Sequence, residues 1–249
     1  EYGFAIGDQV EFTIYDGGRQ IPLTVTIQAS VDDGGSAAFV IPEESYEALG
    51  LDGLRAYKDT VEYLRAQGLP VIADVKRGDI AKTAEMYARA HFTGELEVDW
   101  MTLAPYMGLD SIEPYAQYMR ENGKGVFVLC RTSNPGAKDF EYELLADGRH
   151  VYDMVGDKLN AMGKAFLGES GYSSLGLVIG GTHIEEAMQI RARYRDSFFL
   201  IPGYGAQGGT AQDIAQYLSA GNGGVVNSSR GVLLAYKKQP GVPFAEAAY

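Results

Sequence analysis

Three charged residues at the end of one predicted strand could carry acid–base chemistry. The apolar run at 70–73 predicts a strand, and Asp74-Val75-Lys76-Arg77-Gly78-Asp79-Ile80 follows it. Residues two apart in a strand point to the same side, so we expect Asp74 and Lys76 to project together. Asp79 begins the next helix, where it could join the charges of Lys76 or reach a neighbouring subunit. A lysine between carboxylates stays protonated, which suits a general acid that delivers a proton to a carbanion. The spacing is equally compatible with a surface ion-pair cluster.

Two glycine-rich stretches near the C-terminus each follow a predicted strand. They span 202–209 (PGYGAQGG) and 227–231 (NSSRG). Glycines let backbone amides approach an anion closely, the start of the following helix adds its positive dipole, and Arg230 can fork onto phosphate oxygens. In βα barrels the last two strand-to-helix loops are the usual phosphate site. Glycines also make simple tight turns, but two such loops on consecutive strands favour a phosphate site.

The stretch at 131–136 (RTSNPG) follows the strand that ends at Cys130. Ser133 and Asn134 could hydrogen-bond a polar heterocycle or cap a turn, and the motif alone leaves both open. Cys130 lies in an apolar run, so we expect an inert core thiol. The three histidines are scattered without metal-ligand spacing, which argues against a zinc site.

The elements that must position these residues follow a regular rhythm from about residue 50. Apolar residues Leu54, Tyr57, Val61 and Leu64 lie on one face of a predicted helix. Six apolar runs, each followed by a segment that can be helical, predict strands near 70–74, 98–103, 125–130, 175–179, 198–201 and 223–227. This alternation predicts an α/β fold with a parallel sheet, whose ligands bind at the carboxyl ends of the strands. Because most of these runs are apolar throughout, the pattern fits a TIM barrel with a packed interior, although a doubly wound sheet also fits.

The first 40 residues do not follow this rhythm. The segments 10–15 and 23–29 alternate apolar and polar residues, with Asp16-Gly17-Gly18 between them, which predicts antiparallel hairpins. Pro42 starts a turn, and acidic residues follow it at the predicted start of a helix. We therefore expect two regions: an atypical β-hairpin segment at 1–41 and a βα barrel at 42–249.

Composition narrows the class of protein. The chain has 249 residues, 46% of them hydrophobic, and a formal net charge of -12. This charge argues against a nucleic-acid partner and against a docking face for anionic membranes, so any anionic ligand must be held locally. One cysteine excludes an internal disulfide, and no uninterrupted apolar run reaches about 18 residues. We expect a cytoplasmic protein.

Taken together, these stretches resemble orotidine 5'-phosphate decarboxylase, in the bacterial branch with Ser-Asn-Pro-Gly and Pro-Gly-Tyr-Gly-Ala-Gln-Gly-Gly loops. The resemblance runs from about Tyr46 to about Tyr236. It depends on the pattern Asp-x-Lys-x-x-Asp-Ile-x-x-Thr and on the order of the later loops. Ala81 stands where the family favours a small turn residue such as glycine. The residues that match the pattern are Asp74, Lys76, Asp79, Ile80 and Thr83.

The resemblance implies a (β/α)8 homodimer that converts orotidine 5'-monophosphate to UMP and CO2 without metal or organic cofactor, a carbon–carbon lyase of pyrimidine biosynthesis. By this match Asp74 lies against the substrate carboxylate and Lys76 protonates C6. The match also implies that Asp79, Ile80 and Thr83 reach the partner subunit's site. Ser133 would contact the pyrimidine, while Gln207 and Arg230 would hold the 5'-phosphate.

The beginning of the chain departs from the family. A ribose-binding Asp and a Lys that pairs with the Asp matching Asp74 have no visible counterpart, and Ile41 stands where the lysine is expected. Residues 1–40 must supply the missing strands or pair the open sheet edges in another way. Either a foreign segment has replaced the native start, through fusion, engineering or misassembly, or stretches outside these 249 residues are needed.

Two alternatives to the decarboxylase remain open from sequence. One is another decarboxylase or aldolase of the same superfamily, acting on a sugar-acid phosphate. The other is a non-catalytic barrel remnant or fusion scaffold that binds UMP-like phosphates but lacks the full charge network.

Overall fold

The computed structural model describes most of the central part of the chain and shorter pieces at either end. The described residues are 9–16, 19–26, 39–41, 50–181, 184–203, 215–218, 222–227, 237, 239 and 241–242. Among them, no helix combines the length and the apolar character needed to cross a membrane.

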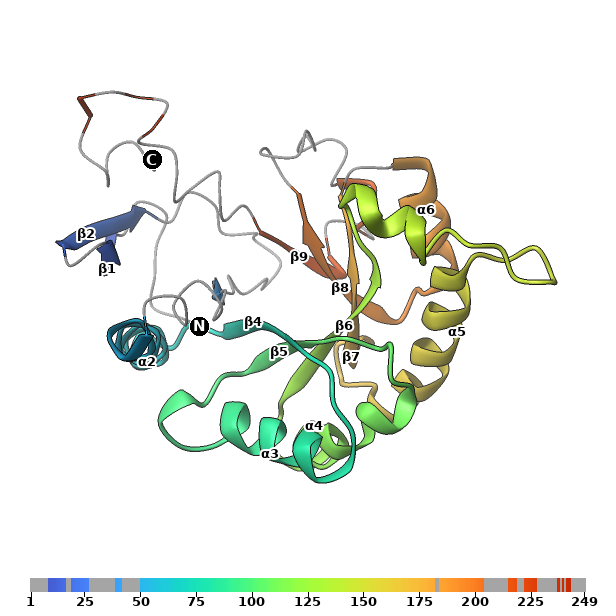
Figure 1. Cartoon of the computed structure of the whole chain (residues 1–249), viewed down its shortest axis with the longest axis horizontal. Helices are drawn as coiled ribbons and strands as arrows, with labels where there is room; N and C mark the ends of the chain where they lie inside the picture. Colours follow the sequence, from blue (N-terminus) through green and yellow to red (C-terminus); the bar gives the residue numbers. More distant parts are fainter. Residues whose placement is uncertain are drawn as a thin grey trace.

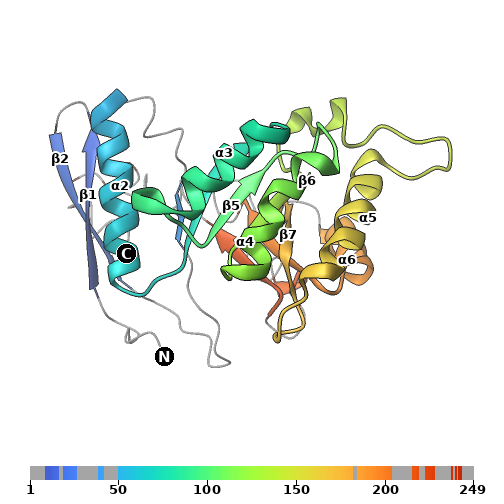
Figure 2. The same cartoon turned by 90° about the horizontal axis from the view of Figure 1, so that it is seen from below.

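The N-terminal hairpin predicted from sequence is confirmed. Strands β1 (Gln9–Asp16) and β2 (Arg19–Thr26) pair antiparallel, with Asp16 opposite Arg19 next to the predicted turn. They form a two-stranded sheet of their own. Helix α2 (Gly50–Ala66) runs beside β1 (Figure 2).

The main sheet has seven parallel strands in the order β3-β4-β5-β6-β7-β8-β9. The six strands predicted from sequence are confirmed, and the short β3 adds a seventh at the edge beside β4. Their bounds are β3 Phe39–Ile41, β4 Val71–Arg77, β5 Trp100–Leu103, β6 Gly125–Arg131, β7 Ser173–Ile179, β8 Ser197–Pro202 and β9 Gly224–Asn227.

The strand order decides between the two α/β architectures that the sequence left open. A doubly wound sheet reverses its strand order at a switch point, whereas a βα barrel adds each strand beside the previous one. The described strands follow the second rule without exception. The sheet curls, and further helices besides α2 lie along its outer side (Figure 1). They are α3 (Ala81–Phe92), α4 (Ala116–Glu121), α5 (Val151–Gly163) and α6 (Ile184–Arg193).

Short 3-10 helices make several of the connections. They are η1 (Gly94–Leu96), η2 (Leu109–Ser111), η3 (Glu113–Tyr115), η4 (Pro135–Asp139) and η5 (Lys164–Phe166). Helix α3 packs against η1, η2 and η3.

The two faces of the parallel sheet bury separate apolar clusters. The larger cluster contains residues of the helices and of one strand face, among them Tyr57, Val61 and Leu64 of α2. Leu54 does not share their burial and is 37% exposed, because it lies about 60° round the helix from the centre of that face.

On the inner face of the sheet, the Trp100 ring stacks on Phe127 with ring centroids 4.5 Å apart, and Leu200 and Val178 belong to the same cluster. Glycine at 125 makes room for the indole, since a Cβ there would lie 2.3 Å from the Trp100 ring. Buried side chains on both faces explain why the strands are apolar throughout.

Candidate active site

The predicted charged pair, Asp74 and Lys76, lies at the carboxyl end of strand β4. The Lys76 Nζ lies 2.7 Å from the Asp74 Oδ1. The Lys76 side chain is 44% exposed and the Asp74 side chain 20%, so the lysine is partly open to solvent while the carboxylate is largely covered. The predicted juxtaposition of Asp74 and Lys76 is therefore present.

The backbone that carries this pair is distorted. The pairing of β4 with β5 joins Ala73 to Met101 and Arg77 to Leu103, so three residues of β4 face Thr102 alone in a β-bulge. Lys76 has a φ of 43°, in the left-handed region that costs a non-glycine residue on the order of 1 kcal/mol. Bulges and strained residues of this kind are common beside active sites, where they aim a side chain.

Thr102 is a member of this site that the sequence analysis missed. Its Oγ1 donates to the Asp74 Oδ1 at 2.9 Å and accepts from the backbone N–H of Lys76 at 2.8 Å. The threonine is buried. A polar residue within an otherwise apolar strand, next to its carboxyl end, was the available signal.

The remaining residues of the charged motif lie where β4 gives way to α3. The backbone N–H of Ile80 donates to the Asp79 Oδ1 at 2.8 Å, and Ile80 is 43% exposed as the residue before the helix. Thr83 is exposed in the first turn of α3. Ala81 has a φ of 49°, which gives a physical reason for a preference for glycine at this position.

Buried ionisable groups lie behind the motif, on α3 and η3. The Arg77 guanidinium lies over the Tyr87 ring, 5.2 Å from its centroid. Burial, together with the nearby Arg77 charge, lowers the pKa of His91 to about 4. Burial raises the pKa of Tyr115, and the Asp79 carboxylate contributes in the same direction. His91 therefore stays neutral at physiological pH.

The predicted Ser133 loop leaves the end of β6 beside the end of β7. Gly180, which follows β7, packs so closely that a Cβ there would lie 2.8 Å from the Ser133 Cβ. The preceding Thr132 is fixed by its backbone N–H, which donates to the Glu141 Oε2 at 2.8 Å. Ser133 thus occupies the same edge of the sheet as the charged pair, at the carboxyl end of a different strand.

An ion pair of a buried arginine supports that loop and was not predicted. The Arg131 guanidinium, at the end of β6, lies 2.9 Å from the Glu186 Oε2 of α6 and also donates to the Tyr142 hydroxyl. That hydroxyl in turn donates to the Glu186 Oε2 at 2.8 Å. The Arg131 side chain is 2% exposed and the Glu186 side chain 31%, so the guanidinium is buried while the carboxylate keeps contact with solvent.

The remaining sequence predictions concern Gln207, Arg230 and Cys130. Gln207 and Arg230 of the glycine-rich loops lie outside the described residues. Cys130 is buried, its Sγ lies 3.4 Å from the Tyr152 carbonyl oxygen, and burial raises its pKa. The prediction of a core thiol is confirmed.

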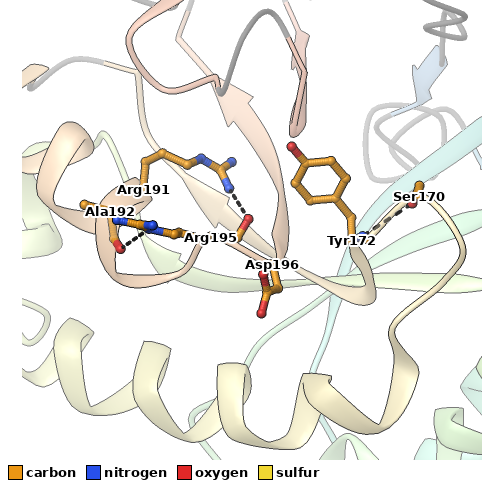
Figure 3. Close-up of a pocket in the computed structure, with 7 residues that line it drawn as sticks. Ser170, Tyr172, Arg191, Ala192, Arg195 and Asp196 are labelled. Atoms are coloured by element: carbon orange, nitrogen blue, oxygen red, sulfur yellow. Dashed lines mark hydrogen bonds between the residues drawn. The ribbon is translucent and has the colours of Figure 1, made fainter.

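A surface pocket of about 520 Å³ lies at the opposite end of the strands (Figure 3). Tyr172 and Asp196, which line it, immediately precede β7 and β8. Arg191 of α6 also lines it, but its guanidinium donates to three backbone carbonyls at 2.7–2.8 Å, those of Tyr217, Ser197 and Gly223. Because its N–H groups bind backbone carbonyls, Arg191 has a structural role here. We place the candidate active site at the carboxyl ends of the strands instead.

Consecutive parallel strands, helices outside the sheet and a charged pair at its carboxyl edge define the class of βα-barrel enzymes. Within that class the chain belongs to the orotidine 5'-phosphate decarboxylase / HUMPS family, whose model matches residues 40–241. The match begins inside β3 and contains every strand of the main sheet except the first residue of β3. It confirms the resemblance seen in the motifs.

Relatives of known name agree with this membership. An orotidine 5'-phosphate decarboxylase of Clostridium tetani is 63% identical over 203 residues, which are 82% of this chain and 70% of that protein. A protein of the same name from Clostridium perfringens strain SM101 is 60% identical over 214 residues, 86% of this chain and 75% of its own length.

Solved structures support the same architecture. The OMP decarboxylase of Leishmania donovani has a TM-score of 0.69 at 32% identity, covering 85% of this chain and 76% of that one. A Streptomyces avermitilis structure described as a putative orotidine 5'-phosphate decarboxylase has a TM-score of 0.71 at 33% identity, covering 85% and 73% of the two chains. The βα-barrel prediction is thus confirmed, with seven of its strands in the described residues.

One predicted departure from the family also falls within the sheet. The register places Ile41, the last residue of β3, opposite Ala73, which directly precedes Asp74. The strand position beside the charged pair therefore carries an isoleucine where the family resemblance led us to expect a lysine.

Proposed function

We propose that this chain decarboxylates orotidine 5'-monophosphate to UMP and CO2 in pyrimidine nucleotide biosynthesis. The observation that carries the proposal is the 2.7 Å ion pair of Lys76 and Asp74, on a bulged strand end inside the region matched by the family model. The names of the Clostridium relatives support the choice of substrate. No metal or organic cofactor enters the proposed reaction.

In the proposed reaction the bond between C6 and the carboxylate breaks, and its electron pair stays on C6. The Lys76 ammonium stabilises that developing negative charge and then donates its proton to C6, so that CO2 and UMP are the products. The Asp74 carboxylate holds the ammonium in place and disfavours the neighbouring substrate carboxylate in the ground state. Solvent returns the proton to Lys76, which is exposed enough to receive it.

Other residues of the motif would hold the substrate. Ser133 would hydrogen-bond the pyrimidine, and its position at the carboxyl edge of the sheet supports this role. Gln207 and Arg230 would hold the 5'-phosphate, as the family resemblance implies.

The proposed enzyme acts as a homodimer in which Asp79, Ile80 and Thr83 reach into the partner subunit's site. Exposed apolar side chains near the start of α3 and in the loop after β5 support such an interface. They are Ile80, Met86, Tyr106 and Met107, which are 43%, 41%, 90% and 47% exposed. Light scattering at micromolar concentrations should give the mass of two chains, and a monomer mass throughout would remove this part of the proposal.

The division of the chain remains a proposal as well. Residues 1–41 would form the atypical hairpin segment and 42–249 the barrel, with β3 contributing the end of the first region to the barrel sheet. A cytoplasmic location is part of the same proposal and rests on the composition of the chain.

The decisive experiment follows the ultraviolet change on conversion of orotidine 5'-monophosphate to UMP. Wild-type protein should turn the substrate over, and Lys76→Ala should keep only a small residual rate. Lys82→Ala is the matched control, because Lys82 is an exposed lysine of α3 paired with Glu85 at 2.7 Å.

Each contrary outcome has its own meaning. An unchanged rate in folded Lys76→Ala would remove the assignment of that lysine. Binding of UMP without turnover by the wild-type chain would instead identify a non-catalytic phosphate-binding barrel. Turnover of a sugar-acid phosphate in place of the nucleotide would move the chain to another branch of the superfamily.

A further inference from the structure

Because of the bulge in β4, a single residue of the neighbouring strand β5 lies opposite the pair of Asp74 and Lys76. Between the paired positions Ala73–Met101 and Arg77–Leu103, three residues of β4 face only Thr102. A regular parallel ladder would instead supply evenly spaced backbone hydrogen bonds between the two strands. The backbone N–H of Lys76 finds its acceptor in a side chain, the Thr102 Oγ1, at 2.8 Å.

The direction of the threonine hydroxyl follows from its contacts. A hydroxyl has one proton to donate, and the Lys76 N–H occupies part of its acceptor capacity. Its proton therefore goes to the Asp74 Oδ1, which lies 2.9 Å away. That same carboxylate oxygen lies 2.7 Å from the Lys76 Nζ. The contacts close a ring from the Lys76 backbone through Thr102 and Asp74 to the Lys76 ammonium.

This ring couples a strained backbone to a charged side chain. Lys76 keeps its left-handed φ of 43° while its amide is bonded to Thr102. Thr102 is fully buried, so water cannot readily replace either of its hydrogen bonds. Loss of the hydroxyl would free the Lys76 amide and leave the Asp74 carboxylate with one fewer donor.

We propose that Thr102 is a positioning residue that holds the Asp74 carboxylate and the Lys76 ammonium in their reactive arrangement. It touches no reacting atom and acts through the other two. The proposal rests on the function proposed above, because it concerns the placement of the same general acid. Misplacement of a catalytic group by about 1 Å can reduce a rate on the order of 100-fold, which sets the scale of the expected effect.

The test uses the full chain with a shape-matched substitution and its conservative rescue. Thr102→Val keeps the branched shape but removes the hydroxyl, and Thr102→Ser keeps the hydroxyl but removes a methyl group. We expect Thr102→Val to lower kcat about 10- to 100-fold with a smaller change in KM, and Thr102→Ser to recover most of the loss. Thr60→Val is the control, since the Thr60 hydroxyl bonds only the Ala56 carbonyl oxygen of α2, at 2.6 Å, among its described contacts.

A double substitution separates positioning from a general structural role. If Thr102 acts through Lys76, then Thr102→Val should change the residual rate of Lys76→Ala far less than it changes the wild-type rate. An equal factor in both backgrounds would overturn the proposal. So would a wild-type kcat in folded Thr102→Val.

Hydrogen exchange at the Lys76 amide keeps the test independent of turnover. We expect exchange to be at least about tenfold faster in Thr102→Val than in wild type and slow again in Thr102→Ser, because a buried amide without its acceptor opens more readily. Unchanged exchange would show that Thr102 does not bridge Lys76 and Asp74, whether or not the chain has the proposed activity. If Thr102→Val does not fold, Thr102→Ala serves the same comparisons.

Discussion

At the carboxyl end of β4, the Lys76 ammonium lies against the Asp74 carboxylate, and the Lys76 side chain is 44% exposed. At the amino ends of β8 and β9, by contrast, the Arg191 guanidinium is buried among backbone carbonyls. The first cation retains access to solvent and sits on a strained residue. The second packs its guanidinium 3.4 Å from the Phe199 ring centroid, and burial lowers its pKa to about 10. One end of the sheet holds a partly exposed cation beside a carboxylate, whereas the other uses a buried cation to join α6 to the starts of two strands.

This comparison predicts that substitutions at the carboxyl end affect turnover, while those at the amino end affect stability. Asp74→Asn should lower kcat about 1000-fold, because it removes the charge that orients the Lys76 ammonium but keeps the shape of the side chain. The free energy of unfolding should change by less than about 1 kcal/mol. Steady-state kinetics and urea unfolding provide the two measurements. Asp52→Asn, at an exposed residue of α2, is the control that should change neither.

The matching change at the amino end is Arg191→Met. It removes the guanidinium that donates to the carbonyls of Tyr217, Ser197 and Gly223, of which Gly223 keeps the Phe199 N–H, so the free energy of unfolding should fall by on the order of 3 kcal/mol. Urea unfolding measures the loss, with Arg195→Met as the control in an exposed arginine of the same pocket. A larger loss of stability from Arg195→Met than from Arg191→Met would contradict the structural role assigned to Arg191 at the amino end of the sheet.

A second buried group, His91, extends the comparison to pH. Because the pKa of His91 is about 4 in the folded chain and about 6.5 when unfolded, unfolding takes up a proton at acid pH. The contribution of His91 to stability is complete above about pH 6.5 and declines as the pH falls toward 4. Between pH 7.5 and 5 the expected loss is about 2 kcal/mol.

The His91 prediction is measured by urea unfolding across this pH range. His91→Gln, which cannot titrate, should flatten that part of the profile. Parallel profiles for the two proteins would show that another group is responsible.

The smallest expected effect concerns the strain at the start of α3. Ala81→Gly should raise the free energy of unfolding by about 0.5–1 kcal/mol, because glycine adopts the φ of 49° without steric cost. Ala90→Gly, at an exposed position within the same helix, should instead lower it by about 1 kcal/mol. Thermal unfolding of the two variants gives opposite signs if the strain is real and the same sign if it is not.

Sequence reasoning recovered the elements with strong local patterns. The apolar runs predicted β4 to β9, and the Asp16-Gly17-Gly18 turn predicted the β1–β2 hairpin. The pattern around Asp74 and Lys76 predicted their proximity, because residues two apart on one strand share a face. The apolar pattern did not predict the short β3, since three apolar residues before a proline carry little signal.

The contacts that sequence reasoning missed all join distant parts of the chain. Thr102 reaches Asp74 across 28 residues, and Arg131 reaches Glu186 across 55. Neither spacing has a local periodicity that a single sequence could reveal. The left-handed Lys76 was equally hidden, since nothing in the residue type favours a positive φ.

The sequence by itself determined the parallel sheet, the hairpin and the residue types at each strand end, because apolar periodicity and turn chemistry act over a few neighbouring residues. Tertiary structure decided the consecutive strand order, the bulge that sets three residues of β4 against Thr102, and the use of Arg191 for packing. These features depend on which strands and helices become neighbours. That choice is made by the packing of the whole chain, and local sequence does not encode it.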